Sequence, residues 1–75
     1  MNISVVIPVL NEEKSIASTL DALRKLAPHE IIVVDGGSDD STRDICSRSG
    51  IKVITSTRGR SRQMNRGAEE ARGEV

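Results

Sequence analysis

The chain has 75 residues, eleven basic and eleven acidic side chains, a formal net charge of zero and no Phe, Tyr or Trp. The zero net charge gives no overall attraction to nucleic acid or anionic lipid, and the missing aromatic residues remove the stacking surfaces that bind single-stranded RNA. The single cysteine excludes an internal disulfide and, with no apolar run long enough to span a membrane, is typical of a cytoplasmic protein.

A β-branched run begins the chain. Residues 3–7, ISVVI, predict a first strand that ends at Pro8, because proline cannot donate to the hydrogen bonds of a sheet. Residues 12–26 predict an amphipathic helix, since the apolar side chains recur at helical spacing at Ile16, Leu20, Leu23 and Leu26. We expect Asn11 to cap this helix, with the two glutamates that follow it near the positive end of the helix dipole.

A second strand and helix follow Pro28. Residues 31–34 form a continuous apolar run, IIVV, which predicts a buried strand. Ser38 or Asp39 can cap the next helix, and Gly50 follows its last turn, where a left-handed residue is expected. One face of that helix collects Thr42, Ile45, Cys46 and Ser49.

A third strand at residues 51–55, IKVIT, leads through a loop rich in glycine and arginine into a third helix at about residues 61–72. The small or flexible side chains that should pack close to the sheet are Met64, Ala68 and Ala71. Gly73 should end this helix, and Val75 reads as the first residue of a fourth strand. We therefore expect residues 1–75 to be the N-terminal part of a single larger domain.

Strands that alternate with helices predict right-handed βαβ crossovers, and hence an α/β fold with a parallel sheet in βαβαβα order. Helices should cover both faces of this sheet. That arrangement explains why the predicted strands are continuous apolar runs instead of alternating ones, because a strand covered on both sides buries every side chain.

Polar loops follow all three predicted strands: PVLNEE at residues 8–13, DGGSDD at 35–40 and TRGRSRQMN at 57–65. In open parallel sheets such loops meet at one edge, where ligands bind. Asp35 at this edge could accept hydrogen bonds from a sugar hydroxyl or a base N–H, and the two glycines after it permit close approach of a ligand. Alternatively, Asp35 only ends its strand and helps to cap the next helix.

Four arginines crowd the third loop and the helix after it. Arg58 and Arg60 flank Gly59 at the predicted ligand edge, where guanidinium groups can bind diphosphate oxygens. The alternative is a solvated helix face, in which Arg66 pairs with Glu70 one turn later.

Three segments, IPVLNEE, EIIVVDGGSDDST and GRSRQMNRGAEEARGEV, resemble in order and spacing the nucleotide-sugar-binding half of a family 2 glycosyltransferase with the GT-A fold. The pattern is most similar to a bacterial subgroup labelled arsenosugar-biosynthesis glycosyltransferases, which share VVDGGS and RGRxxQMNxGA. The resemblance implies a Rossmann-like fold and an inverting transfer of a sugar from a nucleotide-sugar donor to an acceptor hydroxyl. The acceptor itself stays undefined, and neither nucleic acid nor a membrane segment is implied as a partner.

The resemblance also implies which residues bind the donor. They are Pro8, Leu10, Asn11, Glu12, Asp35, Gly36, Gly37, Gly59, Arg60, Arg62 and Asn65. The first two loops would hold the base and ribose, and the third would lie near the diphosphate. Two positions depart from the family pattern: Gly36 replaces an acid that often contacts the base, and Leu10 replaces an aromatic residue. These departures leave the identity of the base open.

A divalent cation, Mg²⁺ or Mn²⁺, is implied for the whole enzyme, with its DxD ligands and the catalytic base expected beyond Val75. Within residues 1–75 we therefore expect no catalytic residue and no metal ligand, and any membrane contact would have to come from later parts of the chain. Asp39 and Asp40 are interpreted as helix-capping acids, Cys46 as a buried inert thiol and His29 as an exposed loop residue.

Other nucleotide-binding classes fit the sequence less well. A dinucleotide-binding Rossmann enzyme lacks its GxGxxG after the first strand, and a P-loop nucleotidase lacks its GxxxxGK[ST]. A non-catalytic nucleotide-binding or receiver-like regulatory module shares the alternating architecture and stays open as the alternative. Glu12 and Glu13 imitate the acidic pair of a receiver weakly, but the glycine-arginine loop would have no role there.

Overall fold

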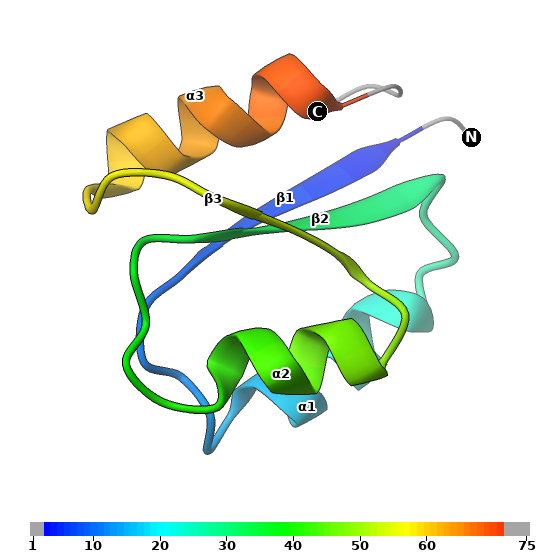
Figure 1. The fold of residues 1–75 in the computed structure, drawn as a ribbon. Helices are drawn as coiled ribbons and strands as arrows, with labels where there is room; N and C mark the ends of the chain where they lie inside the picture. The colour runs from blue at the N-terminus through cyan, green and yellow to red at the C-terminus, as the bar shows by residue number, and fades with distance from the viewer. Residues whose placement is uncertain (1–2, 72–75) are drawn as a thin grey trace.

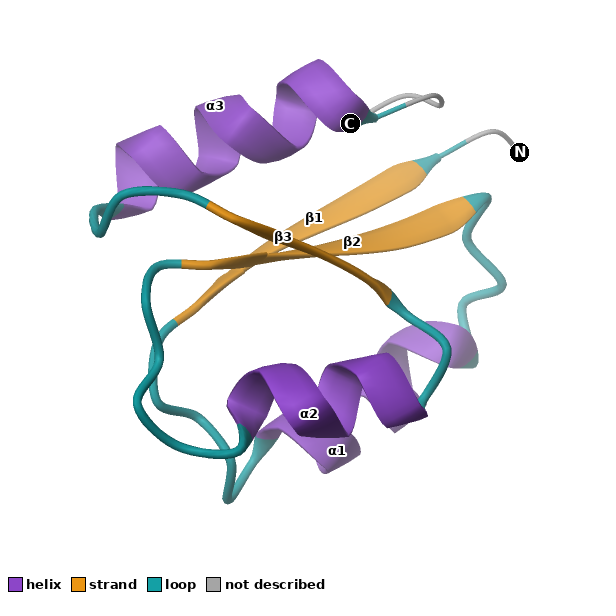
Figure 2. Ribbon diagram, in the orientation of Figure 1, coloured by secondary structure: helices purple, strands orange, loops and turns teal. Residues whose placement is uncertain are grey.

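A computed structural model describes residues 3–71, in which three strands alternate with three helices (Figure 1). The elements are β1 (Ser4–Val9), α1 (Ile16–Arg24), β2 (Glu30–Asp35), α2 (Thr42–Arg48), β3 (Lys52–Thr55) and α3 (Arg60–Glu70). The strands are parallel in the order β1-β2-β3, with α1 and α2 on one face of the sheet and α3 on the other (Figure 2). The predicted α/β fold, parallel sheet and helices on both faces are therefore confirmed. None of the helices within residues 3–71 combines the length and the apolar character needed to cross a membrane.

The three strands end level with one another. Val9, the last residue of β1, is paired with Asp35, which in turn is paired with Thr55 at the end of β3. The strand predicted for residues 3–7 extends past Pro8, which pairs with Val34 inside the ladder. Proline is tolerated there because β1 lies at the edge of the sheet formed by the described strands, where its missing N–H costs no ladder hydrogen bond.

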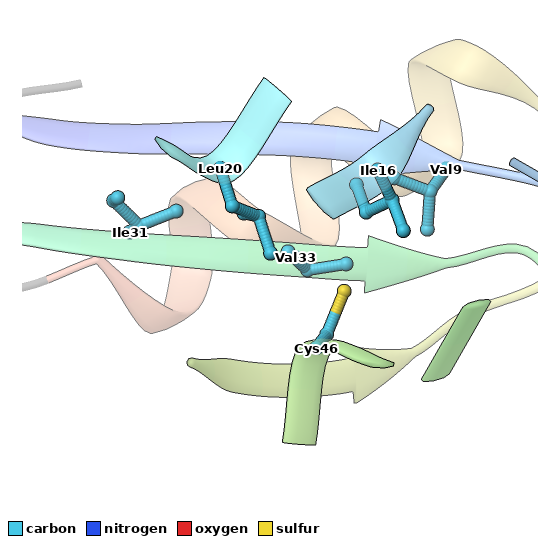
Figure 3. Close-up of a cluster of buried hydrophobic side chains, with 6 residues drawn as sticks. All are labelled: Val9, Ile16, Leu20, Ile31, Val33 and Cys46. Carbon is cyan, nitrogen blue, oxygen red and sulfur yellow. The ribbon is translucent and has the colours of Figure 1, made fainter. Parts of the chain in front are cut away.

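The main hydrophobic core lies between the sheet and the pair α1 and α2. Its buried side chains are Val9, Ile16, Leu20, Ile31, Val33 and Cys46, which Figure 3 shows gathered between the strands and these two helices. The predicted apolar stripe of α1 is wrong at its last member, Leu26, which is 73% exposed. The helix has already ended at Arg24, and the chain turns through Ala27 at a φ of 49° before Pro28.

Helix α3 does not pack against the sheet through the face that the sequence predicted, which was marked by Met64, Ala68 and Ala71. Gln63 and Gly67 are its buried residues, whereas Ala68 is exposed. A Cβ atom on Gly67 would collide with Cγ1 of Val6 and lie 3.0 Å from Cγ2 of Val34. The helix therefore approaches the strands so closely that only glycine fits at this crossing. The predicted stop at Gly73 and the strand at Val75 lie outside the described residues.

We expect Gly67→Val to destabilise the protein by about 2 kcal/mol more than the same side chain placed at position 68, because overpacking against two strands typically costs 1–3 kcal/mol. Ala68→Val is the matched control, since it introduces the same β-branched residue on the exposed side of α3. Urea unfolding of the complete protein measures both. Equal losses for the two variants would contradict the close approach of α3 to the sheet.

Candidate functional site

The three loops that follow the strands meet at the carboxyl edge of the sheet, as the sequence predicted (Figure 1). Hydrogen bonds between backbone groups tie their first residues together. The N–H of Gly36 donates to the carbonyl of Val9 at 3.0 Å, and the N–H of Ser56 donates to the carbonyl of Asp35 at 2.9 Å. The loops are thus held in fixed positions at the tips of the strands.

Asn11 connects the first loop to the second instead of capping α1. Its N–H donates to Oγ of Ser38 at 2.9 Å, and its side-chain Oδ1 accepts from the N–H of Asp39 at 2.7 Å. The residue adopts a φ of 51°, a left-handed conformation that asparagine tolerates better than most residues. The predicted N-cap role is therefore wrong, and α1 is preceded by Ser15.

Side chains at the end of the second loop and at the start of α2 also bind the backbone that leads into α1. The N–H of Glu12 donates to Oγ1 of Thr42 at 2.9 Å, and the N–H of Glu13 donates to Oδ2 of Asp40 at 3.2 Å. These bonds replace a helical start, so α1 begins at Ile16 and not at residue 12 as predicted. They also occupy the backbone donors that the first loop could otherwise offer to an anion.

Asp40 accepts hydrogen bonds at the start of α2, where the sequence analysis offered Ser38, Asp39 and Asp40 as capping residues. Its Oδ1 accepts from the N–H of Thr42 at 2.9 Å and from the Thr42 hydroxyl. These hydrogen bonds, with the one from the Glu13 N–H, hold the pKa of the Asp40 carboxyl below its ordinary value. The N-cap of α2 is Ser41, whose own side chain makes no capping hydrogen bond, so neither Ser38 nor Asp39 is the cap. Asp40 instead satisfies the first N–H of the helix from the position before the N-cap.

The Asp35 carboxylate is fully buried and is directed into its own loop. Its Oδ2 accepts from the N–H groups of Gly37 at 2.9 Å and Ser38 at 2.8 Å, and its Oδ1 accepts from the Ser38 hydroxyl. The Nε atom of Arg43 lies 3.7 Å from Oδ2. The expectation of an open acceptor for a ligand is therefore wrong. The alternative holds, in which Asp35 ends its strand and orders the turn into α2.

The side of the sheet on which Asp35 lies follows from the alternation of side chains along β2. Val33 packs with α1 and α2, so Asp35, two residues later, faces the same way. Val34 faces α3, because its Cγ2 lies near Gly67. The carboxylate consequently faces away from the loop and helix that carry the arginines.

A cleft of about 170 Å³ opens on the α3 side of the sheet edge. It is lined by Pro8, Val9, Leu10, Glu12, Arg60 and Gln63. Four of these residues belong to the predicted site, namely Pro8, Leu10, Glu12 and Arg60. The structure thus brings the first loop and the start of α3 together, while Asp35 is not among the residues that line the cleft.

The other predicted residues do not line the cleft. Gly59 precedes α3 with a φ of 136°, which only glycine adopts readily, and Arg62 and Asn65 are exposed on α3. Gly37, with a φ of 100°, permits the turn closed by Asp35. Gly36 has no room for a Cβ atom, which would lie 2.8 Å from Oε1 of Gln63.

The sequence interpretation missed Gln63, which is only 4% exposed. Its Nε2 donates to the carbonyls of Val9 at 3.0 Å and Val34 at 2.8 Å, and its Oε1 accepts from the N–H of Gly59 at 3.3 Å. One side chain therefore joins the ends of β1 and β2 to the start of α3. A glutamine in a helix rich in polar residues predicts a surface position, so no local signal indicated its burial.

The four arginines of the third loop and α3 divide into two groups. Arg66 pairs with Glu70 at 2.7 Å, as the alternative interpretation predicted, and this hydrogen bond raises the pKa of Arg66 and lowers the pKa of Glu70. Arg58, Arg60 and Arg62 are exposed and form no ion pair within residues 3–71. They lie at the N-terminal end of α3, where the helix dipole adds to their positive charge.

Two further predictions concern residues away from the cleft. Cys46 is buried, and desolvation followed by the negative charge of Asp35 raises the pKa of its thiol, which fits an inert thiol. His29 is exposed in its connecting loop, as predicted. Among the described residues, no three His, Cys, Asp or Glu side chains come together as metal ligands.

The sequence profile described as "Glycosyl transferase family 2" matches residues 4–75. The chain is 47% identical over 51 residues to "Uncharacterized protein MJ1222" of Methanocaldococcus jannaschii, covering 68% of this chain and 21% of that protein. It is 43% identical over 56 residues to "Glucosyl-3-phosphoglycerate synthase" of Mycobacterium tuberculosis, covering 71% of this chain and 17% of that enzyme. The chain therefore spans about a fifth of the length of these relatives.

The fold is also similar to solved structures. The M. tuberculosis glucosyl-3-phosphoglycerate synthase in complex with Mn²⁺, uridine-diphosphate-glucose and phosphoglyceric acid superposes with a TM-score of 0.86 at 32% sequence identity. The match covers 96% of this chain and 30% of the synthase. A further crystal structure, of "a Mycobacterial Protein", gives a TM-score of 0.85 at 31% identity over the same share of this chain and 28% of that one. The described elements thus match the Rossmann-like nucleotide-binding half of a GT-A fold.

We expect Asp35→Asn to reduce the free energy of unfolding by roughly 3 kcal/mol, because an amide nitrogen in place of one carboxylate oxygen leaves buried donors unpaired. Asp39→Asn is the control, since its side chain is exposed, and it should change stability by less than about 0.5 kcal/mol. Urea unfolding measures both variants. A stable Asp35→Asn protein that loses only ligand affinity would show that the carboxylate binds ligand and does not order the loop.

We expect Asp40 to contribute to acid unfolding. Because the folded-state pKa of Asp40 lies below the ordinary value of an aspartate, its stabilisation is fully present above that ordinary pKa and is lost as the pH falls through the lower, folded-state pKa. Asp40→Asn should therefore reduce the loss of stability at low pH, whereas Asp21→Asn on the exposed side of α1 should leave it unchanged. Urea midpoints between about pH 5 and 2 test this, and parallel curves for Asp40→Asn and the unmutated protein would contradict it.

Proposed function

Since the chain belongs to glycosyltransferase family 2, we propose that its protein transfers a sugar from a nucleotide-sugar donor to an acceptor hydroxyl, with inversion at the sugar. Residues 1–75 would be the N-terminal part of a single GT-A domain and would contribute the binding of the donor nucleotide. The observation that carries this proposal is the cleft between the first loop and α3, which Arg60 lines. Arg58, Arg60 and Arg62 are exposed there and form no ion pair within residues 3–71. The similarity to a synthase solved with Mn²⁺ and uridine-diphosphate-glucose supports it.

The diphosphate of the donor would lie against the start of α3. Arg60 lines the cleft there, and Arg58 and Arg62 stand within two residues of it on either side. The backbone N–H groups of Glu12 and Glu13 already donate to the side chains of Thr42 and Asp40, so the first loop offers fewer donors to an anion. Guanidinium groups bind such oxygens in charge-assisted pairs, and Gly59 and Asn65 complete the proposed phosphate end of the site.

The nucleoside end would occupy the inner part of the cleft. Pro8 and Leu10 offer apolar surface on which a base can pack, and Glu12 offers a carboxylate that can accept from a ribose hydroxyl. Asn11 would contribute to donor binding indirectly, because its hydrogen bonds to the second loop hold the first loop in place. Asp35, Gly36 and Gly37 would act in the same indirect way, by shaping the second loop.

A divalent cation, Mg²⁺ or Mn²⁺, is proposed as the cofactor, as in the synthase solved with Mn²⁺. When bound, it would neutralise charge on the departing nucleoside diphosphate. Residues 3–71 contain no group of three suitable ligands, so we assign none of them to the metal. The catalytic base is likewise expected outside them. The DxD motif beyond Val75, the arsenosugar-type subgroup and the cytoplasmic location stay predictions. VVDGGS and RGRxxQMNxGA support the subgroup.

The receiver-like alternative has little support in the site. A phosphoacceptor aspartate at the tip of the middle strand needs an accessible carboxylate, whereas the Asp35 carboxylate is fully buried and hydrogen-bonded to its own loop. The arginines beside the cleft would also have no role in such a module. The match to the glycosyltransferase family over residues 4–75 favours the transferase.

We expect Arg60→Ala in the complete protein to weaken binding of uridine diphosphate about 10-fold and to leave binding of uridine within about 2-fold, because a charge-assisted hydrogen bond to phosphate is worth about 1.5–3 kcal/mol. Isothermal titration calorimetry in the presence of Mn²⁺ measures both ligands. Arg48→Ala is the matched control, since Arg48 is an exposed arginine on α2 that pairs with Asp44. Equal losses for nucleotide and nucleoside would contradict the phosphate role, and absence of binding by the unmutated protein would contradict the proposed function.

A further inference from the structure

Gln63 is the most buried polar side chain of the cleft. It lies on α3 among exposed residues, yet it is 4% exposed and reaches across the edge of the sheet. Its two amide hydrogens are both used, because Nε2 donates to the carbonyls of Val9 and Val34 at 3.0 and 2.8 Å. The two strand ends therefore fix the orientation of the carboxamide.

The oxygen of the same carboxamide, Oε1, accepts fewer hydrogen bonds than it can. Oε1 accepts one hydrogen bond, from the N–H of Gly59 at a long distance of 3.3 Å, whereas an amide oxygen can accept two. Gln63 is one of the residues that line the cleft, so a ligand bound there would lie against this side chain. Among the described residues, one carboxylate lines the cleft, that of Glu12, which is an exposed residue of the first loop.

Gly36 and Gln63 are complementary in shape. A Cβ atom on Gly36 would lie 2.8 Å from Oε1, 2.9 Å from Cδ and 3.1 Å from Nε2 of Gln63. A side chain at position 36 would therefore enter the space that the carboxamide occupies. Because Gly36 has no side chain, the carboxamide of Gln63 on α3 occupies that space and places its acceptor oxygen, Oε1, there.

We propose that Gln63 determines which base the cleft accepts, with Oε1 receiving a hydrogen bond from the ring N–H of a uracil-type pyrimidine. This inference rests on the proposed function, because it places the nucleoside of the donor in the cleft. A cytosine ring presents an acceptor nitrogen at the corresponding position, which would face the oxygen without a hydrogen between them. The buried acceptor would then lose its partner, and such mismatches discriminate more strongly than a change in apolar contact.

The experiment compares the affinities of the complete protein for uridine diphosphate, cytidine diphosphate and inorganic pyrophosphate by calorimetry with Mn²⁺. The unmutated protein should prefer uridine diphosphate to cytidine diphosphate by about 10-fold or more, and Gln63→Met should reduce that preference to within about 2-fold. Pyrophosphate should bind both proteins equally, since it carries no base. Ala68→Met, which adds the same side chain on the exposed side of α3, is the matched control and should keep the preference.

A second pair of variants covers the possibility that Gln63→Met does not fold once it leaves two strand carbonyls unpaired. Gly36→Asp combined with Gln63→Ala moves an acceptor from α3 to the second loop, into the space vacated by the carboxamide. This double variant should retain the preference for uridine diphosphate. Gly36→Ala combined with Gln63→Ala provides no acceptor and should lose it.

The outcomes separate this inference from the function on which it rests. If the unmutated protein binds neither pyrophosphate nor uridine diphosphate, both the donor site and the base reading are overturned. If it binds them but does not distinguish the two nucleotides, only the role of Gln63 is overturned. A preference that persists in Gln63→Met, or that is equal in the two double variants, overturns that role as well.

Discussion

The arrangement of the loops at the carboxyl edge of the sheet depends on the hydrogen bonds of the buried Asp35 carboxylate. A charge at 0% exposure is tolerated only when hydrogen bonds compensate its lost hydration. Here the N–H groups of Gly37 and Ser38 and the Ser38 hydroxyl supply them. Ser38 in turn accepts from the N–H of Asn11, so the carboxylate fixes the second loop and, through it, the first.

The alternation of side chains along the central strand separates support from binding. Asp35 faces α1 and α2 with the hydrophobic core, whereas the carbonyl of Val34 and the space above Gly36 belong to the α3 side. The carboxylate therefore orders the loops from the face of the sheet that α1 and α2 cover, whereas the cleft opens on the face that α3 covers. The cleft is lined by Gln63 and Arg60 of α3 together with residues of the first loop, and no residue of the second loop is among its lining residues.

The close approach of α3 explains both glycines that face this helix. Gly67 lets the helix axis come near Val6 and Val34, and Gly36 leaves room for the carboxamide of Gln63 one turn earlier in the helix. The same approach brings Arg60 to the mouth of the cleft. A helix held farther from the strands could carry the same residues, but its glutamine would not reach the strand-end carbonyls.

The sequence alone determined the alternating elements, the parallel sheet and the common edge of the three loops, because β-branched runs, helical periodicity and turn residues are local patterns. It also indicated four of the six residues that line the cleft. Only the tertiary structure decided which face Asp35 occupies, why residue 36 is glycine and that Gln63 is buried. The physical reason is distance along the chain: Gln63 binds carbonyls 54 and 29 residues away, and no local pattern records which polar side chain will meet them.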